Sequence, residues 1–288
     1  MSSHNTNTPV FSCEFFPPKT DVGMEKLQAV QDQLQNQMQP AFFSVTFGAG
    51  GSTRDRTLET VTTLMANGAS SVVPHISCIG SSKAEIKTLL DTYIENGINR
   101  LVTLRGDIPK DQPVNSNLPG DFAHANELVR FIREHSGNHF HIEVAAYPEY
   151  HPESISPQSD FDCFVQKVKA GANSAITQYF YNIDAYLRFV DKCEQAGLDI
   201  PVVAGIMPIT NFASLSRFSD ACGAEIPRWI RQQLVAFQDD TESLQRFGCD
   251  VVTQLCQRLL AQGAPGLHFY TLNQADATLA IWQQLRQS

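Results

Sequence analysis

The sequence predicts an α/β protein: a single-domain (β/α)8 barrel of the TIM type, with an extra helix before the eighth strand. Eight β-rich segments recur along the chain, and a stretch with helical apolar spacing follows each of them. Nearly every segment ends in a polar residue, as expected where the carboxyl ends of the strands form an active site. The length of 288 residues suits one such barrel, which takes about 250 residues, although length alone also permits two domains.

The predicted strands carry their polar residues close to their carboxyl ends. In chain order they are Pro9–Phe16 with Glu14, Ala41–Gly48 with Thr46, Ser71–Cys78 with His75, Arg100–Asp107 with Arg105 and Asp107, His139–Glu149 with Tyr147 and Glu149, Ser174–Tyr181 with Gln178, and Gly266–Asn273 with Tyr270 and Asn273. The seventh segment, Ile200–Ile209, is the exception and ends in Met207 and Pro208. The early strands begin roughly 30 residues apart, which is the size of one βαβ unit. This regular spacing predicts a parallel barrel.

Glycines and two irregular stretches complete the predicted architecture. Gly68, Gly97, Gly171 and Gly197 each stand between a helix and the next strand, a usual place for a glycine that ends a helix. The segment 221–264 is too long for one barrel helix, so we expect an extra helix at Pro227–Phe237 and a second at Glu242–Gln262. The proline-rich segment Ile108–Asp121 follows the fourth strand, and we expect it to be an active-site loop.

Composition excludes several classes of protein. The net charge of −9 argues against binding to nucleic acid or to an anionic membrane. No apolar run reaches the 18 or so residues of a membrane span, and residues 1–8 lack the apolar core of a signal peptide. We therefore expect a cytoplasmic protein with a flexible N-terminus over 1–8 and a catalytic barrel over 9–288. The seven scattered cysteines fit reduced thiols, and no metal-ligand pattern is found.

The segment FSCEFFPPK suggests an acid catalyst. Glu14 lies in it between Cys13 and Phe15, and apolar neighbours favour the protonated form of a carboxyl group. A protonated carboxyl group is a usable proton donor near neutral pH. The alternative is a Glu14 that points outward and pairs with a lysine, and the segment alone does not exclude it.

Two further segments suggest contacts to phosphate groups. The glycines of SVTFGAGGSTRDRT, at 48–51, do not match the dinucleotide fingerprint, and a flexible loop with Arg54 and Arg56 in surface ion pairs explains them equally well. In LVTLRGD, Gly106 permits a close backbone approach, Arg105 is able to neutralise a phosphate, and Asp107 is able to accept a proton. The alternative for this segment is a surface pair between Arg105 and Asp107.

The fifth and sixth units supply aromatic, charged and amide groups. Prolines in AAYPEYHPE fix the loop that carries Tyr147 and His151, so both rings are held for stacking or hydrogen bonding. Lys167 follows on the next helix, where it could meet a phosphate or simply belong to a solvated face. Gln178 offers one donor group and one acceptor to a planar ring.

Together these segments resemble the methylenetetrahydrofolate reductase family, flavoproteins of one-carbon metabolism and methionine biosynthesis. The matching blocks are EFFPPK, SVTFGAGGSTRDRT, PHISC, LRGD, AAYPEYHPES, AITQYFYN, GIMPITNF and HFYTLN, which follow the family order over nearly the whole chain. The resemblance implies a (β/α)8 fold, bound FAD, and reduction of 5,10-methylenetetrahydrofolate to 5-methyltetrahydrofolate by NADH or NADPH. It also implies a homo-oligomer as a common state.

The resemblance assigns a role to individual residues. Glu14 matches the general acid, and Asp107 matches a carboxylate beside both flavin and folate. Gln178, Phe218 and Gln274 match positions that bind substrate. The residues that match FAD contacts are Thr46, Phe47, His75, Arg105, Gly106, Asp107, His124, Tyr147, His151, Asp160 and Lys167.

Two positions depart from the family pattern. Gln274 stands where the family usually has an arginine that reaches the glutamate tail of folate, and Ser214 stands where a glutamine is common. The loss of a cation removes a charge-assisted contact, so recognition of the tail should differ in this chain. One alternative is a relative of the same fold that has lost the flavin or changed its substrate, and the retention of Arg105 and Lys167 argues against the loss of flavin. The other alternative is a catalytically silent partner subunit, and the retention of Glu14 and Asp107 argues against it.

Overall fold

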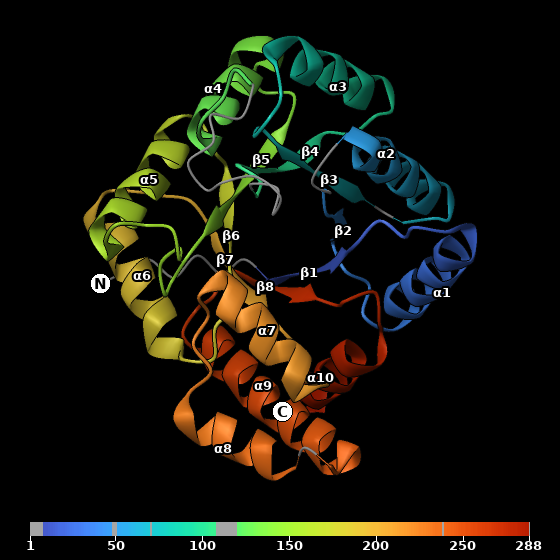
Figure 1. The fold of residues 1–288 in the computed structure, drawn as a ribbon, viewed down its shortest axis with the longest axis vertical. Coiled ribbons are helices and arrows are strands. Elements are labelled where there is room, and N and C mark those ends of the chain that lie inside the picture. Colours follow the sequence, from blue (N-terminus) through green and yellow to red (C-terminus); the bar gives the residue numbers. More distant parts are fainter. Residues whose placement is uncertain (1–7, 48–50, 70, 108–119, 238, 288) are drawn as a thin grey trace.

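The computed structural model describes residues 8–47, 51–69, 71–107, 120–237 and 239–287, and these form a closed barrel of parallel strands. The strands follow one another around the barrel in chain order, and the last pairs with the first (Figure 1). They are β1 Val10–Phe15, β2 Phe42–Val45, β3 Val72–Ser77, β4 Arg100–Leu104, β5 His141–Ala146, β6 Ser174–Thr177, β7 Val202–Ile206 and β8 Gly266–Tyr270. The predicted fold class is therefore confirmed.

Helices form a ring around the barrel, as Figure 1 shows. Those in the described residues are α1 Asp21–Gln37, α2 Gly51–Ala66, α3 Lys83–Glu95, α4 Ala125–Ser136, α5 Pro157–Lys169, α6 Ile183–Gln195, α7 Phe212–Cys222, α8 Arg228–Ala236, α9 Thr241–Ala261 and α10 Asp276–Gln287. The predicted extra helix before the eighth strand corresponds to α8, and the predicted helix after it corresponds to α9. Both predictions are confirmed.

The two faces of each strand bury different kinds of side chain. On β1, Cys13 and Phe15 are fully buried in the large apolar layer between barrel and helices, where Phe15 stacks on Phe43 at 5.1 Å between ring centroids. Ser12 and Glu14 alternate with them and face the barrel interior. Because alternation separates neighbours in sequence, the aromatic flank that was expected to desolvate Glu14 does not surround its carboxyl group.

The interior of the barrel is apolar in one layer and polar in the others. Phe42, Val73, Val102 and Ile176 form a small buried cluster there. The layer towards the amino ends of the strands holds Glu143, which is 1% exposed and pairs with Arg100 at 2.6 Å. The layer towards the carboxyl ends holds Glu14 and two histidines. The apolar cluster thus separates two sets of charged groups that would otherwise share one interior.

Left-handed glycines end several helices, as the sequence predicts. Gly68, Gly97, Gly171 and Gly197 have φ angles of 91°, 73°, 119° and 67°. The predicted strands overrun the observed ones, because residues such as Tyr147 and Gln178 already lie in loops. The glycine turn at 48–50, most of the predicted loop 108–121, and residues 1–7 lie outside the described residues.

Two further findings concern membranes and metals. Of the helices in the described ranges, none has the length and apolarity that a membrane crossing requires. Across those same ranges, no three His, Cys, Asp or Glu side chains gather closely enough to hold a metal ion.

Gly205 permits a close contact between the neighbouring strands β6 and β7. Its backbone N–H donates to the hydroxyl oxygen of Thr177 at 2.9 Å, and a Cβ placed on Gly205 would lie 2.1 Å from the carbonyl oxygen of Thr177 and 2.8 Å from the ring of Tyr270. The carbonyl belongs to the neighbouring strand and has no room to retreat. A glycine is therefore required at this position for packing.

We expect Gly205→Ala to lower the free energy of unfolding by about 1–3 kcal/mol, the usual cost of overpacking a core. Urea unfolding followed by circular dichroism measures the change. Gly97→Ala is the control, because Gly97 has a positive φ with open space around it and so reports backbone strain alone. A loss no larger than about 0.5 kcal/mol for Gly205→Ala would contradict the packing argument.

Candidate active site

A cavity of about 710 Å³ opens at the carboxyl ends of the strands, between the loops that follow β2 to β5 and the helices α4 and α5. Most of the residues predicted to bind the cofactor line it: Phe47, Arg105, Gly106, Asp107, His124, Tyr147, His151, Asp160 and Lys167. These residues come from three loops and one helix, so the fold brings together residues up to 120 positions apart. Nine of the eleven residues predicted to bind the cofactor therefore share one cavity.

Arg105 pairs with a residue that the sequence did not suggest. Its guanidinium contacts the carboxylate of Glu153 at 2.7 Å, whereas the sequence offered Asp107 as its partner. Glu153 also lines the cavity, and Asp107 is exposed at its edge. The side chain of Arg105 is 28% exposed, so solvent screens the pair and an incoming anion is able to compete for the guanidinium.

Gly106 is a glycine for a reason that differs from the predicted one. Its φ is 90°, and a Cβ there would lie 2.8 Å from the hydroxyl oxygen of Ser77. The constraint comes from the protein itself, since Ser77 and Ile79 of the neighbouring strand and loop press against this position. Any larger residue would displace the loop that carries Arg105 and Asp107.

The wall formed by α5 holds a lysine in a partly apolar setting. Lys167 donates a hydrogen bond from Nζ to the carbonyl oxygen of Ala145, and its ammonium lies 5.7 Å from the ring centroid of Phe164. Burial lowers the pKa of Lys167 to about 8, although Asp160 acts in the opposite direction. Asp160 in turn accepts a hydrogen bond from Ser154. Lys167 thus lines the cavity as a cation that donates to a backbone carbonyl and has no carboxylate within ion-pair distance among the described residues.

Tyr147 and His151 form an aromatic corner of the cavity. Their ring centroids are 4.8 Å apart in an edge-to-face arrangement. Nδ1 of His151 accepts a hydrogen bond from the backbone N–H of Glu153, which fixes that ring. Burial, together with Arg105, lowers the pKa of His151, and burial with Asp107 and Asp160 raises the pKa of Tyr147 to about 12. Both rings are therefore neutral near pH 7.

Among the described residues, two of those predicted to bind the cofactor, Thr46 and His75, do not line this cavity. The backbone N–H of Thr46 donates to the carbonyl oxygen of Phe15, and its own carbonyl accepts from Thr57, so Thr46 joins β1 to α2. His75 instead faces the barrel interior and contacts Glu14. The structure therefore separates these two residues from the remaining predicted cofactor residues.

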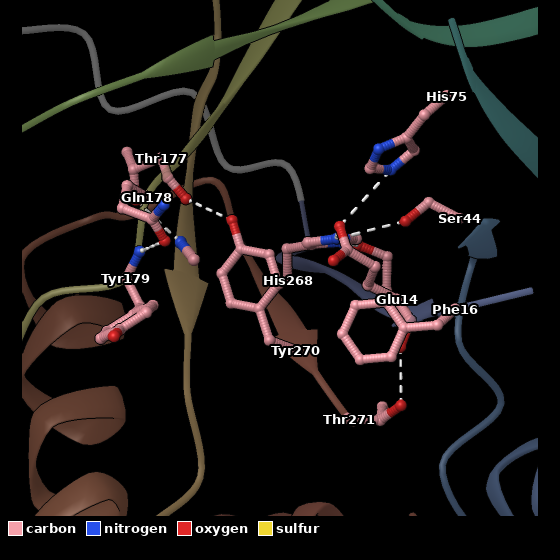
Figure 2. Close-up of polar contacts among 12 residues, drawn as sticks. Glu14, Phe16, Ser44, His75, Thr177, Gln178, Tyr179, His268, Tyr270 and Thr271 are labelled. Atoms are coloured by element: carbon pink, nitrogen blue, oxygen red, sulfur yellow. Dashed lines mark hydrogen bonds and ion pairs between the residues drawn. The ribbon is translucent and has the colours of Figure 1, made fainter. Parts of the chain in front are cut away.

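Glu14 lies at the mouth of the barrel beside two imidazoles. Its Oε2 atom is 3.4 Å from Nε2 of His75 and 3.6 Å from Nε2 of His268, and its side chain is 12% exposed (Figure 2). Burial lowers the pKa of His75 to about 4, so this ring is neutral near pH 7. The outward orientation that the sequence left open for Glu14 is wrong, and the partners are histidines rather than a lysine.

His268 was missed in the sequence because the motif that contains it looks apolar. The alternation of β8 places Leu267 and Phe269 in the outer layer and turns His268 and Tyr270 inward. Tyr270 donates a hydrogen bond to the carbonyl oxygen of Thr177 at 2.7 Å. A period-two reading of the eighth strand against Ser12 and Glu14 of the first would have detected this set.

Hydrogen bonds join the loop after β8 to the end of β1 and the loop that follows it. Thr271 donates to the carbonyl oxygen of Glu14 at 2.6 Å. Asn273 accepts from the backbone N–H of Phe16 at 2.8 Å and donates to the carbonyl oxygen of Phe16 at 2.9 Å. Leu272 and Asn273 have φ angles of 53° and 57°, a left-handed conformation that costs energy for residues other than glycine. The side-chain bonds of Asn273 offset that cost.

The predicted substrate residues follow the last three strands: Gln178 comes after β6, Phe218 lies on α7 after β7, and Gln274 comes after β8. The amide oxygen of Gln178 accepts a hydrogen bond from the backbone N–H of Tyr179 at 3.0 Å, which fixes the orientation of the amide group. Phe218 on α7 is 42% exposed, and Gln274 is exposed at the end of the β8 loop. Ser214 accepts a hydrogen bond from Arg217 at 3.2 Å.

A family model for methylenetetrahydrofolate reductase matches residues 1–286 of the chain. The chain belongs to the methylenetetrahydrofolate reductase family. It is thus a member of a family of oxidoreductases, and the family residues named above can be located in the geometry just described.

Curated members of the methylenetetrahydrofolate reductase family align with most of the chain. The 5,10-methylenetetrahydrofolate reductase of Escherichia coli is 38% identical over 274 residues, which cover 95% of this chain and 90% of that protein. Methylenetetrahydrofolate reductase (NADH) 1 of Arabidopsis thaliana is 38% identical over 284 residues, which cover 96% of this chain but 48% of that protein.

Solved structures share the fold at low sequence identity. An uncharacterised protein from Clostridium thermocellum that binds two copies of 5-methyl-5,6,7,8-tetrahydrofolic acid has a TM-score of 0.67 and 15% identity, covering 98% of this chain and 96% of its own. A dihydropteroate synthase from Xanthomonas albilineans has a TM-score of 0.51 and 11% identity, covering 97% and 94%. These similarities support the barrel architecture of the methylenetetrahydrofolate reductase family member described here.

We expect Asn273→Ala to lower the free energy of unfolding by about 2–4 kcal/mol, because it removes two hydrogen bonds and leaves an alanine at a left-handed φ. Asn273→Gly is the matched variant, since it removes the same bonds without the strain. Chemical denaturation should therefore rank the stabilities as wild type, Asn273→Gly, Asn273→Ala in descending order. Equal stability of all three proteins would contradict the role assigned to this side chain.

Proposed function

We propose that the chain reduces 5,10-methylenetetrahydrofolate to 5-methyltetrahydrofolate with electrons from NADH or NADPH and with bound FAD. Residues 9–288 then act as one catalytic domain, in the cytoplasm and in a homo-oligomer. The observation that carries the proposal is that the carboxyl group of Glu14 lies at the carboxyl end of the barrel strands, the same end at which residues that match the family's cofactor contacts line a cavity. An oxidoreductase family and this pairing of groups together favour a redox reaction that needs a proton donor.

The residues of the cavity fit FAD. Its volume of about 710 Å³ is in the range of cofactor sites, and Arg105 and Lys167 supply cations for a pyrophosphate. Tyr147 and His151 supply neutral rings for stacking. Bound FAD would supply the redox chemistry that links the nicotinamide to folate, and these residues would hold and orient it.

Glu14 acts as the general acid in the proposed reaction. The five-membered ring of methylenetetrahydrofolate is a poor electrophile, and a proton given to its aniline nitrogen opens it to an iminium ion. Glu14 donates that proton and becomes a carboxylate beside two imidazoles. Because the iminium is cationic, a nearby negative charge stabilises it.

Asp107 supplies that negative charge at the cofactor cavity. It is exposed at the cavity edge and stands next to Gly106, where the backbone conformation fixes its position. A carboxylate there would disfavour an anionic reduced flavin and would therefore favour the transfer of hydride away from the flavin. Gln178 and Phe218 orient folate, and Gln274 meets its tail without a cation.

Glu14→Gln tests the proposed acid. We expect the half-reaction with NADH or NADPH to continue while folate reduction slows by about 10²–10⁴-fold, the usual effect of losing a general acid. Stopped-flow absorbance of the flavin measures both half-reactions separately. The control is Glu95→Gln, because Glu95 is an exposed carboxylate at the end of α3. Equal slowing of both half-reactions would contradict the role of Glu14.

A second prediction concerns the charge of Lys167. Its pKa is lowered to about 8 in the ligand-free protein, so the charged form is lost as the pH rises through 8. Binding of a pyrophosphate requires that charge, and we therefore expect the Kd of FAD to rise by up to about tenfold per pH unit above pH 8. The Kd should be constant below pH 7.

Fluorescence titration with FAD between pH 6.5 and 9.5 measures this dependence. Lys167→Met should bind FAD more weakly at pH 7 and should lack the rise above pH 8. Lys169→Met is the matched control, because Lys169 lies on the same helix and is exposed. An identical pH profile in Lys167→Met and wild type would assign the titration to another group.

A further inference from the structure

His268 is buried in the barrel interior below Glu14, and its accessible surface is 0%. Nδ1 lies 2.7 Å from the hydroxyl oxygen of Ser12, and Nε2 lies 3.4 Å from that of Ser44 and 3.6 Å from Oε2 of Glu14. Figure 2 shows the ring in front of β1, with Ser44 and His75 on the other side of the carboxyl group. Every polar contact of His268 thus points to the residue proposed as the acid or to a serine.

The hydrogen bond at Nδ1 determines whether Nε2 carries a proton. A neutral imidazole carries one N–H, and a serine hydroxyl that donates to Nδ1 leaves the proton on Nε2. Nε2–H then points between Glu14 and Ser44. The contact to Glu14 at 3.6 Å is longer than a hydrogen bond, and catalytic contacts of this kind commonly shorten when substrate binds.

Both imidazoles approach the same oxygen of the carboxyl group. His75 and His268 each lie within 3.6 Å of Oε2. An oxygen that accepts a hydrogen bond from Nε2–H is the poorer site for the proton of the neutral acid. The transferable proton therefore resides on Oε1.

We propose that His268 is a positioning residue for Glu14: its Nε2–H, fixed as a donor by Ser12, holds Oε2 and thereby presents the transferable proton on Oε1. The inference rests on the proposed role of Glu14 as proton donor. After the proton has moved to the aniline nitrogen of folate, Nε2–H stabilises the carboxylate that remains. The imidazole gives up no proton in this step, so the step balances with one proton transferred from Glu14 to folate.

Other titratable groups around His268 must be distinguished from Glu14. His75 on β3 has its pKa lowered to about 4, and Tyr270 on β8 has its pKa raised well above its usual value, both by burial, so neither changes charge between pH 5 and 9. Glu143 on β5 is held by the guanidinium of Arg100 through bonds of 2.8 Å and 2.6 Å. Subtraction against a Glu14→Gln variant removes the signal of Glu143 from a titration.

The first experiment titrates Glu14 directly in the FAD-free protein. Infrared difference spectra follow the carboxyl C=O band with pH in wild type and in His268→Leu, each minus the same protein carrying Glu14→Gln. Loss of the donor destabilises the carboxylate, so we expect the titration midpoint of Glu14 to move up by roughly one pH unit in His268→Leu. His268→Gln keeps an N–H donor and should restore at least half of the shift.

Ser12→Ala serves where His268→Leu does not fold. It frees the proton to occupy either ring nitrogen, and it should shift the midpoint of Glu14 in the same direction by a smaller amount. An unmoved midpoint in both His268→Leu and Ser12→Ala would overturn the inference. So would a shift in His268→Leu that His268→Gln leaves entirely in place, because that pattern indicates a structural role alone.

The second experiment uses the FAD-loaded enzyme in single turnovers with methylenetetrahydrofolate. The rate of a general acid falls above its pKa, so the basic limb of the pH profile should move up in His268→Leu and the rate below it should fall about tenfold. If Glu14→Gln still reduces folate, the proposed role of Glu14 as general acid is overturned. The infrared measurement of the Glu14 titration midpoint does not depend on that outcome. If Glu14→Gln is inactive but the basic limb of the pH profile does not move in His268→Leu, only the positioning role of His268 is overturned.

Discussion

The pairing of the first strand with the last is the interaction on which the site depends. In the observed register Glu14 lies beside Tyr270 and Ser12 lies beside His268. A shift of β1 by one residue would turn Ser12 and Glu14 to the outer layer, where Cys13 and Phe15 now pack, and would separate them from His268 and Tyr270. The closed barrel therefore fixes the acid, its histidine and its serine in one step, and no loop has to place them.

The sequence predicted the architecture better than the chemistry. The eight β-rich segments and the extra helix before the eighth strand follow from local patterns of apolar residues, turn residues and length, which one chain contains in full. The environment of Glu14 does not follow from such patterns. Its neighbours in sequence are apolar, yet its neighbours in space come from β3 and β8, and only the register of the barrel determines them.

Pairs between loops were also beyond the reach of the sequence. Arg105 and Asp107 are two residues apart and of opposite charge, which made their ion pair a natural expectation. The guanidinium instead contacts Glu153, because the β5 loop turns back over the cavity. Gly106 was expected to make room for a ligand, and the structure gives it a second task, since Ser77 and Ile79 already fill the space of a side chain.

The barrel interior is organised as charged, apolar and charged layers. Arg100 and Glu143 neutralise each other near the amino ends, so the charge at that level needs no solvent. The apolar cluster above them keeps the upper layer in a medium of low polarity, where the orientation of a single N–H matters more than it does in water. The same arrangement explains why His75 is neutral near pH 7 although it lies beside a carboxyl group.

The pair of hydrogen bonds between Asn273 and the backbone of Phe16 has a consequence for biosynthesis. The two residues are 257 positions apart, and they meet only when β8 has entered the barrel. Contacts this distant in sequence form late during folding, and a ribosome delivers β8 after every other strand. A nascent chain that already contains Arg105, Tyr147 and Lys167 would thus be able to build the walls of the cavity before the acid at the barrel mouth has reached its position.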